Sequence, residues 1–181
     1  MRARILLLVI LAASCGRAPA RPTAAAEPGI APRPFTAEQI RAAMPVGTEI
    51  RFRVEESGKP VTILQWRVTA ADEATMTMTA RMLGEDGAVL AEEPATPTRW
   101  DELVGHATFP ADRTTRTQGT VDLPAGRFDT IDYTVSETQG ASKTVSAFHF
   151  ARSLPGPPVL IVVEKDGTEV RRMTLLSRTP R

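Results

Sequence analysis

The chemistry available to this 181-residue chain is limited by its few reactive side chains. It contains one cysteine and two histidines, His106 and His149, which lie far apart in the sequence. A single cysteine excludes an internal disulfide framework and a cysteine-rich zinc or iron–sulfur site. The other possible metal ligands are scattered carboxylates, such as Asp101 and Glu102, without a metal-binding spacing. We therefore expect no metal and no cofactor.

Known catalytic patterns are also missing from the sequence. It has no Gly-x-Ser-x-Gly, His-Glu-x-x-His or phosphate-binding Walker motif. Asp129 and Asp132 are three residues apart in a predicted strand, so their side chains point to opposite faces and form no local carboxylate pair. His149 is expected as a solvated or core-edge residue on the polar face of its strand, and His106 ends a short predicted helix. We expect no catalytic residue and no enzymatic activity.

Three methionines form the most informative side-chain pattern. Met76, Met78 and Met82 recur on one face of a predicted strand. Methionine is unbranched and polarizable, so it adapts to irregular partners. If the concave face of the sheet is incompletely filled, these residues would line an apolar pocket, and the same pocket would include three aromatic residues: Trp66, Phe128 and Phe148. The alternative interpretation is that all six residues pack an ordinary core.

The N-terminus has the three zones of a secretory signal peptide. Arg2 and Arg4 supply positive charge, residues 5–11 are an unbroken apolar run, and residues 12–14 are small. The apolar run is too short to span a bilayer, which takes about 20 residues. The only cysteine, Cys15, directly follows the small residues.

The segment Leu11-Ala12-Ala13-Ser14-Cys15 resembles the lipobox of bacterial lipoprotein signal peptides, with Ala12 where leucine is usual. The resemblance implies that the signal peptide, residues 1–14, is removed. It also implies that Cys15 is acylated, for example with palmitate, so that a lipid anchor holds the protein on a membrane. Gly16 stands where an aspartate would resemble an inner-membrane retention signal. The resemblance therefore favours the outer membrane, with the domain facing the periplasm or the cell surface.

Charge and composition characterise the chain beyond the anchor. A formal net charge of +1 lacks the excess of basic residues that is typical of nucleic-acid-binding proteins. Residues 16–34 hold five of the fifteen prolines and almost no large apolar side chain. This composition predicts an extended tether, so that residues 15–34 comprise the lipidated cysteine and the tether, and residues 35–181 form a β-domain.

The domain is expected to begin with a helix of about two turns. Thr36 and Gln39 form a capping box, and Phe35 and Ile40 form the matching hydrophobic staple. A proline at position 45 blocks continuation, which predicts a helix over residues 36–44.

Alternation of apolar and polar residues then predicts a series of strands. The expected strands cover residues 49–54, 61–68, 75–83, 88–91, 117–123, 127–135, 143–150, 159–163 and 170–176. Residues 159–163 are expected to be buried on both faces, and Asp166-Gly167 is a strong hairpin signal. The pattern predicts a mainly β fold, with a curved antiparallel sheet or partly open barrel of eight or nine strands and two short helices.

The second helix is expected after a break in the strand pattern. Pro94 and Pro97 are predicted to flank a loop, and residues 98–104 to form a short helix capped by Thr98. Trp100 within this helix is either a lid residue or, in the favoured interpretation, an anchor of the helix to the sheet.

Several segments of the C-terminal half form a second resemblance. Leu123-Pro124-Ala125-Gly126-Arg127-Phe128, Phe148-His149-Phe150, Pro157-Pro158-Val159 and Asp166-Gly167 occur in that order. Together they are similar to uncharacterised bacterial envelope proteins with a Pro-Ala-Gly-x-Phe turn. The expected architecture is also similar to the LolA/LolB lipoprotein carriers, whose half-barrel holds acyl chains, although this analogy rests on fold alone.

These observations support three functional hypotheses. The favoured one is a lipid-anchored envelope protein that acts as an interaction or structural module, with another envelope protein as a partner. The second is a module that binds or carries an apolar ligand or lipid in the methionine-lined pocket. The third and least favoured is an enzyme.

The anchor gives a first prediction. Replacing Cys15 by serine removes the sulfur that would form the thioether to lipid, so Cys15→Ser should be unacylated, with its signal peptide uncut or miscut. Metabolic labelling of expressing cells with a palmitate analogue measures this directly. Equal labelling of the wild type and the variant would contradict the lipoprotein interpretation.

Overall fold

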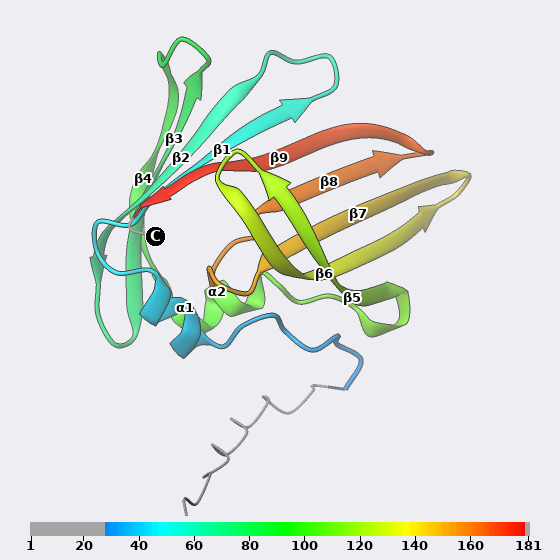
Figure 1. Ribbon diagram of the computed structural model, residues 1–181, viewed down its shortest axis with the longest axis horizontal. Helices are drawn as coiled ribbons and strands as arrows, with labels where there is room; N and C mark the ends of the chain where they lie inside the picture. The colour runs from blue at the N-terminus through cyan, green and yellow to red at the C-terminus, as the bar shows by residue number, and fades with distance from the viewer. Residues whose placement is uncertain (1–27, 180–181) are drawn as a thin grey trace, which may run out of the picture.

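Antiparallel strands dominate the computed structural model, which describes residues 28–179 (Figure 1). The predicted signal peptide, Cys15 and most of the predicted tether lie outside the described residues. Nine strands form one sheet in the order β4-β3-β2-β1-β9-β8-β7-β6-β5. Their bounds are β1 Glu49–Glu56, β2 Thr62–Ala71, β3 Thr75–Gly84, β4 Val89–Arg99, β5 Thr114–Leu123, β6 Gly126–Gln139, β7 Ser142–Ala151, β8 Leu160–Lys165 and β9 Thr168–Thr179.

The first and last strands meet in the middle of the sheet. β1 pairs antiparallel with β9, and a run of hairpins extends from this central pair to the two edges, β4 and β5. The sheet is strongly curved but does not close, because β4 and β5 do not pair with each other (Figure 1). The predicted fold class, a curved antiparallel sheet with two short helices, is therefore confirmed.

Two short helices lie on the concave side of this sheet (Figure 1). α1 (Ala37–Ala43) precedes β1, and α2 (Trp100–Gly105) lies in the connection between the two edge strands, together with the short 3-10 helix η1 (Ala111–Arg113). The two α-helices contact each other. Neither helix, nor any other helix in residues 28–179, is long and apolar enough to cross a membrane.

α1 forms where its capping signals predict it. The backbone N–H of Gln39 donates to Thr36 Oγ1 at 3.2 Å, and the Thr36 N–H donates to Gln39 Oε1 at 2.9 Å. This reciprocal pair satisfies two N–H groups that a helix N-terminus otherwise leaves unpaired. Phe35 and Ile40 are both buried, so the helix packs its apolar side onto the sheet.

The second helix and the preceding strand correct the sequence interpretation. β4 continues through Pro94 and Pro97 to Arg99, and the predicted loop does not form. Thr98 lies in this strand, and Arg99 is the N-cap residue of α2. Proline lacks the N–H of a sheet ladder, but an edge strand tolerates it because one side of the strand has no partner. β4 is such an edge, which explains why two prolines did not end it.

β8 also differs from its prediction. Leu160 at its start is buried, but residues 161–163 are only partly buried, so the run is not enclosed on both faces. The helices cover the concave face incompletely, and no element of residues 28–179 forms a second layer over the convex face (Figure 1). The following Asp166-Gly167 turn is as predicted: both residues have positive φ, 51° and 79°, and they join β8 directly to β9.

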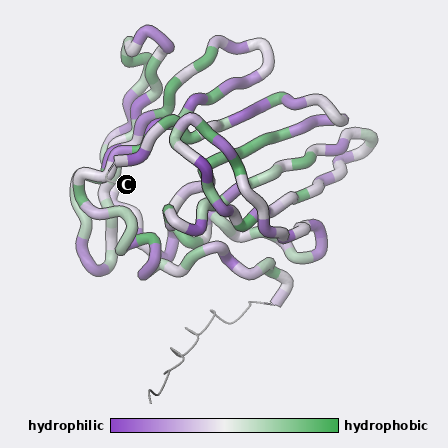
Figure 2. The backbone as a smooth tube through the Cα atoms, viewed as in Figure 1, coloured by the Kyte–Doolittle hydropathy of each residue, from purple (hydrophilic) through white to green (hydrophobic). Residues whose placement is uncertain are grey.

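The core lies between the concave face and the helices. Apolar residues alternate with polar ones along most strands, which the hydropathy colouring makes visible as alternating bands (Figure 2). Every member of the main buried cluster lies between Ala31 and Leu175, and its fully buried members include Tyr133 and Phe52.

The last residues of the predicted tether contact this core. Ile30 forms an isolated bridge with Pro110, and the Ala31 N–H donates to the Phe109 carbonyl oxygen at 2.8 Å. The buried Tyr133 hydroxyl donates to the Pro32 carbonyl oxygen and accepts a bond from Arg116 Nε. Burial raises the pKa of this hydroxyl above its ordinary value, so it stays protonated and able to donate.

The terminal hairpin gives a second prediction. Gly167 has φ of 79°, a conformation that a β-branched residue adopts only under strain of about 1–3 kcal/mol. Gly167→Val should therefore lower the midpoint of thermal unfolding by several degrees, measured on the protein made without residues 1–15. Thr168→Val is the matched control, because it places the same side chain at the adjacent strand position, and it should leave the midpoint nearly unchanged. Equal midpoints for both variants would contradict the assigned turn.

Candidate functional site

An apolar cavity of about 340 Å³ lies between the concave face of the sheet and the two helices. Almost all of its walls are aliphatic, aromatic or proline side chains. It is lined by Pro34, Phe35, Ile40, Met44, Trp66, Met76, Met78, Thr98, Leu103, Val104, His106, Ala107, Phe109, Phe148, Phe150, Gly156, Pro157, Pro158 and Ile161.

Four of the six predicted pocket residues line this cavity: Trp66, Met76, Met78 and Phe148. Three of them come from the neighbouring strands β2 and β3, and Phe148 comes from β7 on the other half of the sheet. Met78 of β3 pairs with Val68 of β2, and Trp66 of β2 pairs with Ala80 of β3, so these side chains share the concave face. Trp66 also packs edge-on against the ring of Phe52 on β1, with ring centroids 5.3 Å apart.

The other two predicted residues do not reach the cavity. Met82 is 40% exposed and lies near the end of β3, where the pairing with β4 shifts register between Met82 and Leu83. Phe128 is partly buried against the core, near Gly126 at the start of β6. Both residues share a strand with core residues. The cavity covers only part of the length of the concave face, and it does not extend to either of them.

The missed lining residues come mainly from segments without strand periodicity. α1 and the residues that flank it contribute Phe35, Ile40 and Met44, and α2 contributes Leu103 and Val104. The loop between β7 and β8 adds Gly156, Pro157 and Pro158. The hydrophobic staple identified the first helix as amphipathic, but no local pattern shows which face of the sheet it covers.

A cluster of aromatic rings forms one wall of the cavity. Phe109, which follows α2, lies with its ring centroid 5.0 Å from that of Phe148 and 6.3 Å from that of Phe150. Phe150 in turn contacts Phe35 edge-on at 6.1 Å. Tilted and edge-to-face contacts of this kind add stability beyond the buried area. They fix the connection after α2 against β7.

Trp100 attaches α2 to the turn between β2 and β3, on the half of the sheet away from β7. Its side chain is buried, and its Nε1–H donates to the Asp72 carbonyl oxygen at 3.0 Å. The Asp72 carboxylate accepts from the backbone N–H groups of Thr75 and Ala74, which hold its pKa below the usual range. Because Trp100 does not line the cavity, it acts as the predicted anchor and not as a lid.

The cavity offers little for acid–base or metal chemistry. Among its lining residues only Thr98 and His106 have polar side chains. His106 is the C-cap residue of α2, and His149 lies on the other face of β7, because its neighbours Phe148 and Phe150 both point into the cavity. No group of three or more potential metal ligands occurs among residues 28–179. The arrangement suits contact with hydrocarbon.

The remaining titratable candidates form a separate polar pair. His149 Nδ1 lies 2.8 Å from Asp132 Oδ1 on the convex face, and both side chains are mostly buried. Asp132 occupies the space beside Gly119, where a Cβ atom would collide with the carboxylate. Asp129 instead accepts from the Thr120 hydroxyl. The two aspartates therefore belong to different local contacts, away from the cavity.

Comparison with known proteins shows a shared fold. No protein-family model matches the chain, and no curated protein matches it at a significant level of sequence similarity. A protein from Parabacteroides distasonis, described as a "putative lipoprotein", aligns with TM-score 0.53 and 7% identity over 81% of this chain and 98% of that protein. A Bacteroides fragilis protein, described as a "putative exported protein with YmcC-like fold", gives TM-score 0.45 and 12% identity over 75% of this chain and 96% of that protein.

Neighbouring methionines of β3 give a third prediction. Both residues line the cavity, but Met76 is 2% exposed and belongs to the buried core cluster, whereas Met78 is only partly buried. Met76→Ala should cost about 2–5 kcal/mol of unfolding free energy, as for other buried methionines, and Met78→Ala less than about 1 kcal/mol. Urea denaturation of both variants measures the difference. A loss of about 2 kcal/mol or more for Met78→Ala, by the same principle, would show that its surroundings are filled.

Proposed function

We propose that this protein is a lipid-anchored component of a bacterial envelope that binds an apolar ligand in the cavity between its sheet and helices. The observation that carries the proposal is the cavity itself, with 17 of its 19 lining residues lacking a polar side chain. Water has few partners in such a space, so a hydrocarbon chain is the occupant that its walls favour. The proposal assigns binding and not catalysis.

The size and walls of the cavity support this proposal. Ligand cavities in proteins span about 300–1,000 Å³ and are mostly apolar, and a cavity of about 340 Å³ lies at the small end of that range. One hydrocarbon chain therefore suits it better than a two-chain lipid. Met44, Met76 and Met78 provide flexible contacts around such a chain.

The location within the envelope rests on the N-terminus. The signal peptide and lipobox pattern supports acylation at Cys15 and an outer-membrane anchor, with the domain in the periplasm or at the cell surface. The similar fold of the Parabacteroides distasonis protein, itself described as a "putative lipoprotein", supports an envelope location. A membrane is thus the proposed partner on the N-terminal side.

A second candidate function is an interaction module, and the β4 edge favours it. No strand of residues 28–179 pairs with the outer side of β4, and its two large apolar residues, Val89 and Leu90, are 57% and 59% exposed. An unpaired edge can accept a strand from another protein. Pro94 and Pro97 lack the N–H groups for a full ladder, which restricts such pairing to part of the strand.

Ligand binding gives a fourth prediction, tested on the soluble protein made without residues 1–15. N-phenyl-1-naphthylamine, an uncharged apolar probe, should bind with a rise in fluorescence. Met78→Trp should reduce the affinity for the probe at least tenfold, because the larger ring fills the cavity. Met82→Trp is the matched control on the same strand, and it should bind the probe like the wild type because Met82 lies outside the cavity.

Two results would contradict ligand binding. One is absence of probe binding to the wild-type protein. The other is an equal loss of binding in Met78→Trp and Met82→Trp, which would place the probe elsewhere. Absence of binding together with strong destabilisation by Met78→Ala would leave the interaction module as the favoured function.

A further inference from the structure

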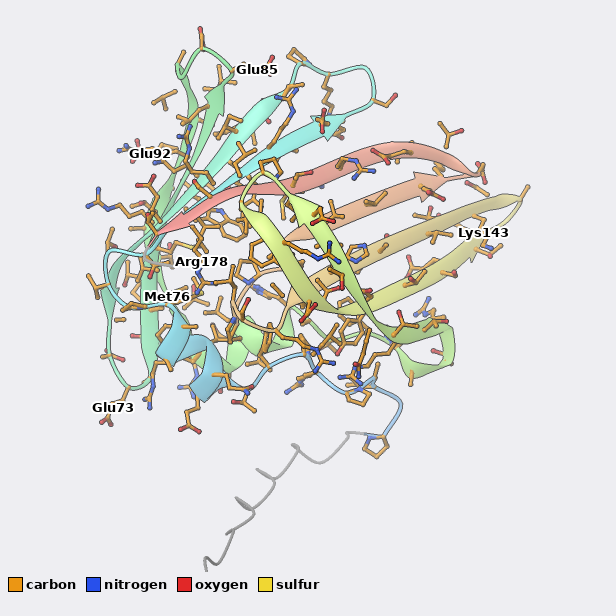
Figure 3. All side chains as sticks on the ribbon, in the orientation of Figure 1. Glu73, Met76, Glu85, Glu92, Lys143 and Arg178 are labelled. Atoms are coloured by element: carbon orange, nitrogen blue, oxygen red, sulfur yellow. The ribbon has the colours of Figure 1, made fainter. Side chains whose placement is uncertain are left out.

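A buried arginine without an acidic partner lies beside the cavity. Arg178 of β9 is only 6% exposed, and it belongs to no ion pair among the described residues. Burying an unpaired cation is costly in a protein, so such groups are normally neutralised by a carboxylate. Figure 3 places Arg178 in the interior, on the same side of the sheet as Met76.

A β-bulge directs Arg178 into the interior. Met173 and Leu175 of β9 face the core, and simple alternation would turn residue 178 to the other face. The pairing of β9 with β1 shifts by one residue between Phe52 and Arg51, so Arg178 instead pairs with the buried Ile50. Bulges re-aim side chains in this way and are frequent next to functional sites.

The hydrogen bonds of Arg178 leave part of its guanidinium unused. Nη2 donates to the Ala43 carbonyl oxygen at the end of α1, and Nη1 donates to the Pro155 carbonyl oxygen at 3.2 Å. Nε is buried without a hydrogen-bond partner. Both acceptors are neutral, and burial without a nearby carboxylate holds the pKa of Arg178 below its ordinary value. The group is a charged donor whose counter-ion is not supplied by residues 28–179.

The guanidinium adjoins the cavity at Gly156 and Met44, which both line it. A Cβ atom placed on Gly156 would lie 3.5 Å from Arg178 Nη1 and 3.2 Å from the Met44 sulfur. Glycine at this position therefore adds no side chain of its own between the cavity and the arginine. Gly156 has φ of 144°, so the backbone itself also disfavours a larger residue there.

We propose that Arg178 receives the oxyanion head of a single-chain amphiphile whose hydrocarbon chain occupies the cavity. The inference deepens the proposed function and rests on it: the cavity binds the tail, and Arg178 selects a carboxylate or phosphate head over an uncharged one. Arginine donates to such oxyanions through charge-assisted hydrogen bonds, about twice as strong as neutral ones. The head group would also supply the counter-ion that residues 28–179 do not provide.

Displacement of bound N-phenyl-1-naphthylamine by three twelve-carbon ligands tests this inference. Dodecanol has the tail without charge, whereas dodecanoate and dodecyl phosphate carry the two oxyanion heads. We expect the wild-type protein to bind at least one anion tenfold or more tightly than dodecanol, and the ratio between the two anions identifies the preferred head. Arg178→Met should remove this preference and change dodecanol affinity by less than threefold. Arg67→Met, which removes an exposed arginine from β2, should behave like the wild type.

Each contrary result has a distinct meaning. If no ligand binds, the proposed function and this inference both fail. If dodecanol and the anions bind the wild type equally, or if the preference persists in Arg178→Met, the cavity binds chains but Arg178 only ties α1 to the β7–β8 loop. Should Arg178→Met fail to fold, the Arg178 Nε–H nuclear magnetic resonance signal of the wild type decides: it should shift with dodecanoate and not with dodecanol, and equal shifts would overturn the inference.

Discussion

The pairing of β1 with β9 is the contact on which the rest of the structure depends. It joins the first and last strands of the chain at the centre of the sheet, so that every other strand is added by a local hairpin on one side or the other. The two edges are therefore β4 and β5, which are consecutive in sequence, and the connection between them must cross the open side of the curved sheet. α2 and η1 lie in that connection, and α1 packs beside α2. The cover over the concave face thus follows from the topology.

The same constraint accounts for the cavity. A closed barrel fills its interior with side chains from all strands, whereas this open sheet relies on two helices of seven and six residues to cover a face of nine strands. Two helices this short carry too few side chains to fill the space enclosed by the concave face. On one side, ring contacts of Phe35 and Phe109 attach the helical segments to β7. On the other side, the hydrogen bond from Trp100 to the Asp72 carbonyl oxygen attaches α2 to the turn between β2 and β3. The space between these two attachments is where the apolar cavity remains.

The sequence predicted those features that depend on local patterns. The capping box set the start of α1, because its hydrogen bonds involve residues three apart, and alternation placed Trp66, Met76 and Met78 on one face. Alternation could not say how far along a strand the cavity extends, so Met82 and Phe128 were wrongly grouped with it. The prolines of β4 were misinterpreted because their effect depends on whether a strand is central or at an edge, which is a property of the whole sheet. Arg178 was missed for a similar reason: its direction is set by a bulge in long-range pairing.

The two kinds of cavity wall suggest how selectivity would be divided. The aromatic wall of Phe109, Phe148 and Phe150 is held by mutual ring contacts, so its shape is fixed. The facing methionines have several rotatable bonds and can follow chains of different thickness or bend. Hydrophobic walls discriminate weakly between similar chains, since one methylene changes binding by about 1–3 kcal/mol at most. A polar site that must be satisfied discriminates far more strongly, because leaving a buried charge unpaired is costly. Under the proposed function the tail would therefore contribute affinity with little selectivity. Arg178, the buried cation beside the cavity, would be the group that distinguishes one amphiphile from another.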